Sequence, residues 1–224
     1  MDIISSWSGG KDSMLACYRA MKDDHHVKCL LNLVSAREKR CCFHGTGTNL
    51  LADQARCVGI PLVQREMREG MDEYEIDFKE AVTGLTGGGI RGMVFGDIYL
   101  DEHREWVERV CGDIGVTALE PLWNNDPKSI IEEFIDAGFT ATVVSCKEEL
   151  GRDFVGRALD REALKRLERL GMCPCGEHGE YHTIVTDGPI FSKRIMITKA
   201  EPVLKEGFWR HWSLDIREYT MEDK

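Results

Sequence analysis

A six-residue run near the start of the chain, SGGKDS from Ser8 to Ser13, has the composition of a phosphate-binding loop. Glycines let the backbone approach an anion closely, so that successive N–H groups can converge on it. The two serines add hydroxyl donors, and Lys11 adds a positive charge. Asp12 is unfavourable beside bare phosphate but suits phosphate accompanied by Mg²⁺. The run therefore predicts a site for a phosphate-bearing ligand with magnesium; the alternative is a polar turn that only caps a helix.

A second polar cluster lies near the other end of the chain and consists of Cys173, Cys175, Glu177, His178, Glu180 and His182. Its two glutamates stand in a glycine-bearing loop, where a pair of carboxylates can hold ammonium, steer an amine or ligate a cation. Zinc is a weaker interpretation, because C-x-C with scattered histidines departs from the usual spacing of zinc ligands. A polar turn before a strand is a further interpretation that the sequence leaves open.

Two other features attract attention for their residue types. Cys41, Cys42 and His44 form a short cluster, which we interpret as a loop wall near the ligand or as non-functional, rather than as a metal site. Trp123 is either a substrate contact or a buried aromatic side chain, and both interpretations stay open.

The elements that must position these residues alternate between strand and helix in the first half of the chain. The patterns predict strands at 2–7, 29–35, 60–63, 93–95 and 116–119, and helices at 11–21, 49–58, 72–85 and from Asp101, which we expect to cap its helix. This rhythm implies a parallel sheet with helices on both faces. Ligands of such sheets bind beyond the carboxyl ends of the strands. Ser35 and Gly96–Asp97 should therefore share that edge with the SGGKDS run.

The second half changes character. Asp126 followed by Pro127 predicts a helix start, and another helix is predicted at 160–170. Strands are predicted at 139–146, from Thr183 onward, at 194–198 and at 209–216, which indicates a terminal antiparallel sheet. We therefore predict two domains: a Rossmann-like α/β domain at 1–122, which carries the SGGKDS run, and a smaller α+β domain at 123–224.

The common nucleotide motifs do not account for the loop. A Walker A motif would need Ser or Thr where Asp12 stands, and its first glycine would fall at Ser5. Gly87, Gly89 and Gly92 match the dinucleotide fingerprint, but they precede a predicted strand instead of following one.

Bulk composition restricts the class of protein. The net charge of −10 argues against a general nucleic-acid binder, which normally carries a basic face. The nine cysteines do not form a secreted disulfide pattern, and we find neither a signal peptide nor an apolar run of membrane-spanning length. These features predict a soluble, cytoplasmic protein that needs no membrane, while its oligomeric state, including a homo-oligomer, stays open.

The loop resembles the PP-loop of the N-type ATP pyrophosphatases, and the whole chain resembles the diphthine–ammonia ligase family within that superfamily. The matching stretches are SGGKDS, QARCVGIPL from Gln54, GDI from Gly96, PLW from Pro121, the pair Gly156-Arg157 and CGEHGEYHT from Cys175. The resemblance implies a PP-loop fold and an enzyme that adenylates a carboxylate with ATP and Mg²⁺ and then lets ammonia displace AMP. Pyrophosphate is the other product.

The resemblance also implies roles for individual residues. ATP would be bound by Ser8, Gly9, Gly10, Lys11, Asp12, Ser13, Ser35, Gly96 and Asp97, with Asp12 also a ligand of Mg²⁺. The acceptor and ammonia would be bound by Trp123, Arg157, Glu177, Glu180 and His182. Lys11, Asp12, Glu177 and Glu180 would take part in the chemistry.

The chain departs from the family at the acceptor side, because the family pattern has an acidic residue where this chain has His182. The acceptor is therefore either diphthine on elongation factor 2 or a small carboxylic acid such as a corrinoid-type compound. A tRNA-thiolating PP-loop enzyme and a non-catalytic nucleotide sensor are further alternatives. The acidic charge and the absence of C-x-x-C disfavour the first, and the intact SGGKDS run disfavours the second.

Overall fold

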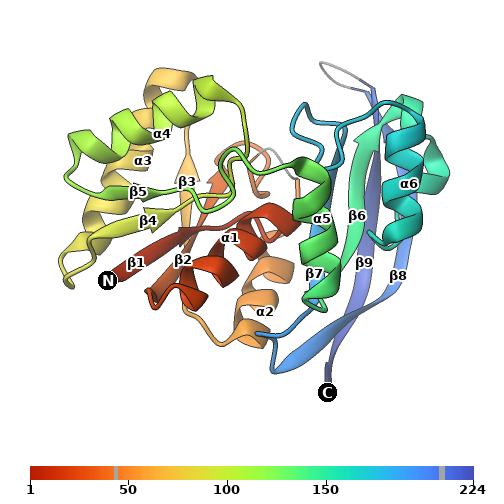
Figure 1. Ribbon diagram of the computed structural model, residues 1–224, viewed down its shortest axis with the longest axis horizontal. Helices are drawn as coiled ribbons and strands as arrows, with labels where there is room; N and C mark the ends of the chain where they lie inside the picture. The colour runs from red at the N-terminus through yellow and green to blue at the C-terminus, as the bar shows by residue number, and fades with distance from the viewer. Residues whose placement is uncertain (43–44, 207–209) are drawn as a thin grey trace. The chain divides into compact units, whose positions relative to one another are not determined.

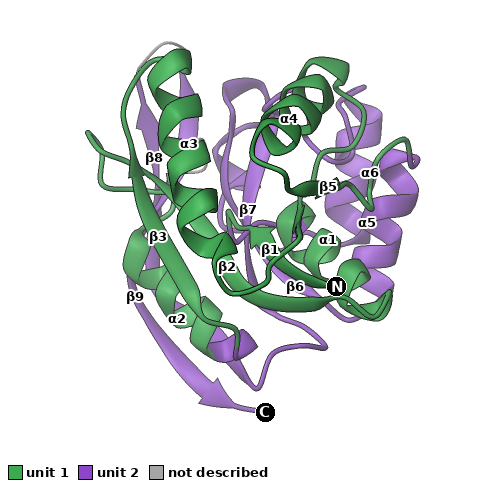
Figure 2. Ribbon diagram, turned by 90° about the vertical axis from the view of Figure 1, so that its left-hand side faces the viewer, with its two compact units in different colours: residues 1–8, 12–56, 60–124 green, residues 9–11, 57–59, 125–224 purple. Residues whose placement is uncertain are grey.

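The computed structural model describes residues 1–42, 45–206 and 210–224, and divides them into two compact units (Figure 2). Unit 1 contains residues 1–8, 12–56 and 60–124. Unit 2 contains residues 9–11, 57–59 and the described part of 125–224. Three residues of the SGGKDS run thus belong with the C-terminal half of the chain.

Unit 1 is built on a five-stranded parallel sheet, counted over the described residues, with the order β3-β2-β1-β4-β5. Its strands are β1 (Asp2–Ser6), β2 (His26–Ser35), β3 (Leu62–Met67), β4 (Gly92–Val94) and β5 (Thr117–Leu119). The chain proceeds from β1 outward in one direction to β3, then returns to β4 on the other side of β1. The point between β1 and β4 is therefore the topological switch point, where open α/β sheets bind ligands.

Helices cover both faces of this sheet, with α1 and α2 on one face and α3 and α4 on the other (Figure 1). They are α1 (Lys11–Lys22), α2 (Thr48–Val58), α3 (Met71–Thr86) and α4 (Asp101–Asp113). On the α3–α4 face, Phe78 and Val110 join the same buried cluster as the strand residues Ile4, Leu31 and Met93. Burial of this apolar surface is the main source of stability for the layer.

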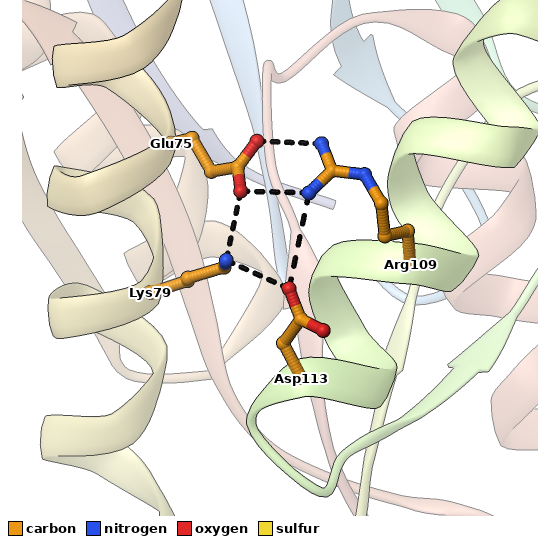
Figure 3. A network of polar contacts seen from close by, with 4 residues as sticks. All are labelled: Glu75, Lys79, Arg109 and Asp113. Carbon is orange, nitrogen blue, oxygen red and sulfur yellow. Dashed lines mark hydrogen bonds and ion pairs between the residues drawn. The ribbon is translucent and has the colours of Figure 1, made fainter.

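A network of four charged side chains joins α3 to α4 at the surface (Figure 3). Glu75 accepts two hydrogen bonds from Arg109, at 2.8 and 2.6 Å, and one from Lys79 at 2.7 Å. Lys79 also donates to Asp113 at 2.8 Å. The bonds from Arg109 and Lys79 lower the pKa of Glu75 to about 2. Because several charges cooperate, the network fixes the two helices together better than a single exposed ion pair would.

Unit 2 contains a four-stranded antiparallel sheet, among the described residues, in the order β7-β6-β9-β8. Its strands are β6 (Thr140–Lys147), β7 (Tyr181–Asp187), β8 (Lys193–Lys205) and β9 (His211–Asp223). Its helices are α5 (Pro127–Asp136) and α6 (Arg161–Arg169), with short 3₁₀ turns at Glu148–Leu150 and Arg152–Phe154. Asp126 and Asp160 cap α5 and α6, since their carboxylates accept backbone N–H bonds from the first turns.

These observations confirm the predicted fold class of a Rossmann-like parallel sheet plus a smaller α+β region. The expectation for Asp101 was wrong: it is the first residue of α4, Leu100 occupies the capping position, and no side chain caps the helix. An acidic residue there still favours the helix, because it faces the positive end of the helix dipole. The third strand also begins at Leu62 rather than at residue 60, and the terminal strands are longer than predicted. Trp209, predicted to start the last strand, lies outside the described residues.

In the part of the chain that the structure describes, no helix has the length and apolar character that crossing a bilayer would require.

Gly96 follows β4 at a point where the backbone touches the start of α1. A Cβ atom there would lie 2.8 Å from the carbonyl carbon of Asp12 and 2.9 Å from the Ser13 nitrogen. Gly96→Ala should therefore lower the free energy of unfolding by about 1–3 kcal/mol, as overpacking does elsewhere. Urea unfolding measures this change. Gly84→Ala in α3 is the control, since its Cβ would meet no atom within 4 Å. Equal unfolding midpoints for the two variants would contradict the close packing.

Candidate active site

The predicted ligand-binding edge of unit 1 is occupied by polar residues that follow its strands. Ser8 follows β1, Ser35 ends β2, and Gly96 and Asp97 follow β4. The hydroxyls of Ser8 and Ser13 lie 3.1 Å apart and form a hydrogen bond with each other beside the first turn of α1. A helix N-terminus with hydroxyl donors is a favourable environment for phosphate.

A buried polar chain fixes the residue that precedes the loop. The indole nitrogen of Trp7 donates to Gln54 Oε1 at 3.0 Å, and Asn32 Nδ2 donates to the Trp7 carbonyl at 2.9 Å. Gln64 Nε2 completes the chain by donating to Asn32 Oδ1 at 3.1 Å. Trp7, Asn32 and Gln54 are all almost fully buried. Buried polar groups with satisfied hydrogen bonds hold one geometry, so this chain orients the entry to the loop.

Cys41 extends the same chain toward the loop. Asn32 Nδ2 lies 3.1 Å from the Cys41 sulfur, which in turn lies 3.9 Å from the Ser8 carbonyl oxygen. Cys41 thus contacts the SGGKDS run, whereas His44, of the same predicted cluster, lies outside the described residues. Burial raises the pKa of the neighbouring Cys42 thiol. A thiol kept protonated is a poor metal ligand and a poor nucleophile.

The middle of the SGGKDS run is hydrogen-bonded to β7, within unit 2. Gly9 has φ of 76°, a conformation that glycine adopts readily, and its carbonyl accepts from the Val185 N–H at 2.9 Å. The Lys11 N–H donates to Thr183 Oγ1 at 3.0 Å, and the Lys11 ammonium lies 4.7 Å from the centroid of the Tyr181 ring. Lys11 is 4% exposed. The loop therefore presents its lysine beside the start of β7, and the Lys11 N–H is already engaged.

His182 is adjacent to this lysine. Burial, then the positive charge of Lys11 and then His211, lower the pKa of His182 to about 4. Its imidazole is therefore neutral near pH 7, and it is a hydrogen-bonding group there rather than a cation.

The carboxylate of Glu180 has a structural task in the loop before β7. It accepts the N–H of His178 at 2.9 Å and that of Cys173 at 3.3 Å, and the residue is buried. Glu177 is half-buried in the same loop. Two backbone bonds to one carboxylate organise a turn, so the structural interpretation accounts for Glu180 at least in part.

The remaining predicted residues lie in different places. Arg157, in unit 2, pairs with Glu162 at 3.1 Å. Trp123 belongs to unit 1, where the Arg104 guanidinium lies 4.8 Å from the centroid of its ring. Asp97 is bonded to His103 Nδ1 at 3.2 Å. Among the described residues, no three Cys, His, Asp or Glu side chains come together as a metal site would require.

The sequence alone assigned no role to Asn32, Gln54, Thr183 or Glu120. The first three act through tertiary hydrogen bonds that no local pattern encodes. Glu120 directly follows β5 at the sheet edge where Asp97 was found, so the same rule of strand ends would have identified it.

The titration of His182 tests its placement beside Lys11. We expect its pKa, followed by NMR of the imidazole, to be about 4 and to rise in Lys11→Met, while staying below the ordinary 6.5 because burial remains. Lys22→Met, at the far end of α1, should leave it unchanged. Since the unfolded chain binds this proton at higher pH, the folded state should lose stability as pH falls from about 6.5 to about 4. An unchanged pKa in folded Lys11→Met would contradict the placement.

Comparison with known proteins gives matches along most of the chain. The family model for the diphthamide synthase N-terminal domain matches residues 1–118, and that for the diphthamide synthase C-terminal domain matches residues 126–219. A human protein named diphthine–ammonia ligase is 26% identical over 252 residues, which cover 100% of this chain and 94% of the human one. A Schizosaccharomyces pombe protein of the same name is 27% identical over 91% of this chain, which spans only 37% of that longer protein.

A solved structure described as a predicted subunit of tRNA methyltransferase, from Methanocaldococcus jannaschii, aligns with 83% of this chain and 95% of its own. Its TM-score is 0.46 and its identity 15%, which is too distant a likeness to support a conclusion about activity. The two domain matches carry the assignment, since together they span nearly the whole chain. The chain belongs to the diphthamide synthase family, whose curated relatives are carbon–nitrogen ligases by name.

Proposed function

We propose that the protein activates a carboxylate with ATP and converts it to an amide with ammonia, as a diphthine–ammonia ligase. The acceptor oxygen attacks the α-phosphorus of ATP and pyrophosphate leaves. Ammonia then attacks the acyl carbon, AMP departs with the former carboxylate oxygen, and one proton is released. The observation that carries this proposal is the SGGKDS loop at the switch point of the sheet, with its serine hydroxyls together and its lysine buried.

The residues of the loop fit a triphosphate with a magnesium ion. Ser8 and Ser13 offer hydroxyl donors at the N-terminus of α1, and Lys11 supplies a positive charge for the departing pyrophosphate. Asp12 supplies a single carboxylate, which suits Mg²⁺ because this ion usually takes its other ligands from phosphates and water. When bound, the ion would neutralise charge on the phosphate oxygens.

We assign the other predicted residues by their place in the fold. Gly9, Gly10, Ser35, Gly96 and Asp97 would surround the nucleotide, so that residues 1–122 bind ATP. Residues 123–224 would select the acceptor, through Trp123, Arg157, Glu177, Glu180 and His182. The hydrogen bonds of Glu180 suggest that it shapes the acceptor loop rather than touching ammonia.

The environment of His182 is compatible with diphthine as the acceptor. A protonated histidine would repel the trimethylammonium group of diphthine, but the lowered pKa leaves this imidazole neutral near pH 7. The histidine in place of an acidic residue is therefore compatible with a cationic substrate. A small carboxylic acid is the second candidate, and the buried positive charge of Lys11 is the observation in its favour.

The nucleotide products test the adenylation. ATP should be split to AMP and pyrophosphate, as resolved by chromatography. Lys11→Ala and Ser13→Ala should each slow turnover by about 10²–10³-fold, if each donor acts like one oxyanion contact. Lys22→Ala is the matched control, because this exposed lysine lies at the opposite end of α1. ADP as the main product would refute the proposal.

The acceptor is tested by competition, with ATP, isotopically labelled ammonium, diphthine-bearing elongation factor 2 and a panel of small polycarboxylic acids. Mass spectrometry should find the label in the elongation factor. His182→Gln should retain most of this activity, whereas His182→Lys should lose at least about tenfold, because a second cation beside Lys11 repels both the lysine and the substrate. Labelling of a small acid alone would show that diphthine is the wrong acceptor.

A further inference from the structure

Glu120 and Asp97 leave the sheet of unit 1 at the same edge. β4 and β5 pair in parallel as far as Val94 and Leu119, and the N–H of Phe95 bonds the Leu119 carbonyl at 2.9 Å. Asp97 comes two residues after Phe95, and Glu120 directly follows Leu119. Gly96, the residue before Asp97, contacts the backbone at the start of α1, while the Asp97 and Glu120 carboxylates lie near His103 and Arg104 of α4.

Glu120 is buried without sufficient hydrogen bonds. Its side chain is 7% exposed, and Oε1 has no hydrogen-bond partner among the described residues. Oε2 lies 3.8 Å from Arg104 Nε, beyond hydrogen-bond range, and that same nitrogen donates to Glu108 at 2.7 Å. A buried carboxylate with an unused oxygen is costly. Oε1 can therefore accept a hydrogen bond from a small donor group.

The charges around Glu120 make it ready to accept a proton. Burial raises its pKa to about 7, and the negative charges of Asp97 and Glu108 add to this, while Arg104 opposes it. The other facing groups are the thiol of Cys111, whose own pKa is raised to about 11, and His103, which bonds Asp97. A group that titrates near 7 is matched to proton transfer at physiological pH.

The surroundings of Glu120 and Asp97 indicate which kind of small ligand would suit this site. Two carboxylates attract a cation, and the unbonded Oε1 calls for an N–H or O–H donor. A metal held by protein side chains alone is disfavoured, because no set of three metal-ligating side chains occurs in the described part of the chain. The Asp97 side chain is 22% exposed, which leaves an approach from solvent. Ammonium is small, cationic and rich in N–H donors.

We propose that Glu120 and Asp97 bind ammonium and that Glu120 accepts its proton, an inference that rests on the proposed ligase function. Ammonium transfers one proton to the Glu120 carboxylate, which becomes a neutral carboxylic acid, and the nitrogen recovers the lone pair that attacks the acyl carbon. Glu120 then returns its proton to solvent. Asp97 accepts hydrogen bonds from the cation and holds it in place.

Carboxyl-carbon NMR of the full chain, with glutamate labelled at its side-chain carboxyl, tests binding without any need for activity. The signal missing from Glu120→Gln identifies Glu120. Ammonium chloride should shift this signal saturably and lower its pKa, whereas tetramethylammonium chloride at the same ionic strength, which has no N–H, should not. Glu108→Gln should keep the response, and Asp97→Asn should weaken it several-fold. An equal response to both salts, or no response to either, would overturn the proposal.

Kinetics separate this inference from the proposed function. Glu120→Gln should raise KM for ammonium and leave KM for ATP unchanged. Hydroxylamine, which is already neutral near pH 7, should restore turnover in this variant because it needs no proton acceptor. Failure of hydroxylamine to restore turnover would contradict the role of Glu120 as proton acceptor. An ammonium-specific NMR shift without any amide product would refute the ligase function while leaving the ammonium site supported.

Discussion

Two hydrogen bonds that tie the SGGKDS run to β7 are the constraint on which the candidate site depends most. Through the Gly9 carbonyl and the Lys11 N–H, residues near the start of the chain are fixed to Val185 and Thr183, far along the sequence. In the same region the Lys11 ammonium lies 4.7 Å from the centroid of the Tyr181 ring, and burial together with the charge of Lys11 lowers the pKa of His182. The SGGKDS run is thus tied to the strand that follows the loop containing Glu177 and Glu180. Gly9 adopts a positive φ, which glycine tolerates readily, and the buried Lys11 ammonium faces the Tyr181 ring.

The sheet edge of unit 1 and the start of β7 supply different chemical environments. The edge carries hydroxyls and carboxylates at the strand ends, and the hydrogen bonds among Trp7, Asn32 and Gln54 fix the chain that enters the SGGKDS run. Near the start of β7 lie the Lys11 ammonium, the Tyr181 ring and the neutral imidazole of His182. Cleaving ATP between its α- and β-phosphates needs cationic and N–H or O–H donors, while freeing ammonia needs a carboxylate that can hold a proton. The chain contains residues of the types that ATP cleavage and the release of ammonia each need.

Much of the fold could be predicted because it depends on local signals. Alternating apolar strands and amphipathic helices predicted the parallel sheet, and Asp126 and Asp160 marked helix starts that the structure confirms by their capping bonds. The position of the loop after the first strand followed from the same signals. Asp101 was misjudged because an acidic residue is favourable both as a cap and in the first turn, and the sequence alone does not distinguish the two.

The electrostatic state of individual residues could not be predicted, because it depends on burial and on distant neighbours. His182 looks like a titratable residue in the sequence, and only its proximity to Lys11 and His211, together with burial, makes it neutral. Glu180 looks like half of a carboxylate pair, yet its oxygens bond the backbone of its own loop. Glu120 carries no motif at all, and its importance emerges from one unbonded buried oxygen.

The path of one oxygen atom tests the account most directly. Diphthine-bearing elongation factor 2 with oxygen-18 in the acceptor carboxylate, incubated with the protein, ATP and ammonium, should yield AMP that carries the label in its phosphate, as mass spectrometry would detect. Label in inorganic phosphate instead, accompanied by ADP, would mean that the acceptor is phosphorylated rather than adenylated, and would contradict the assignment of the loop.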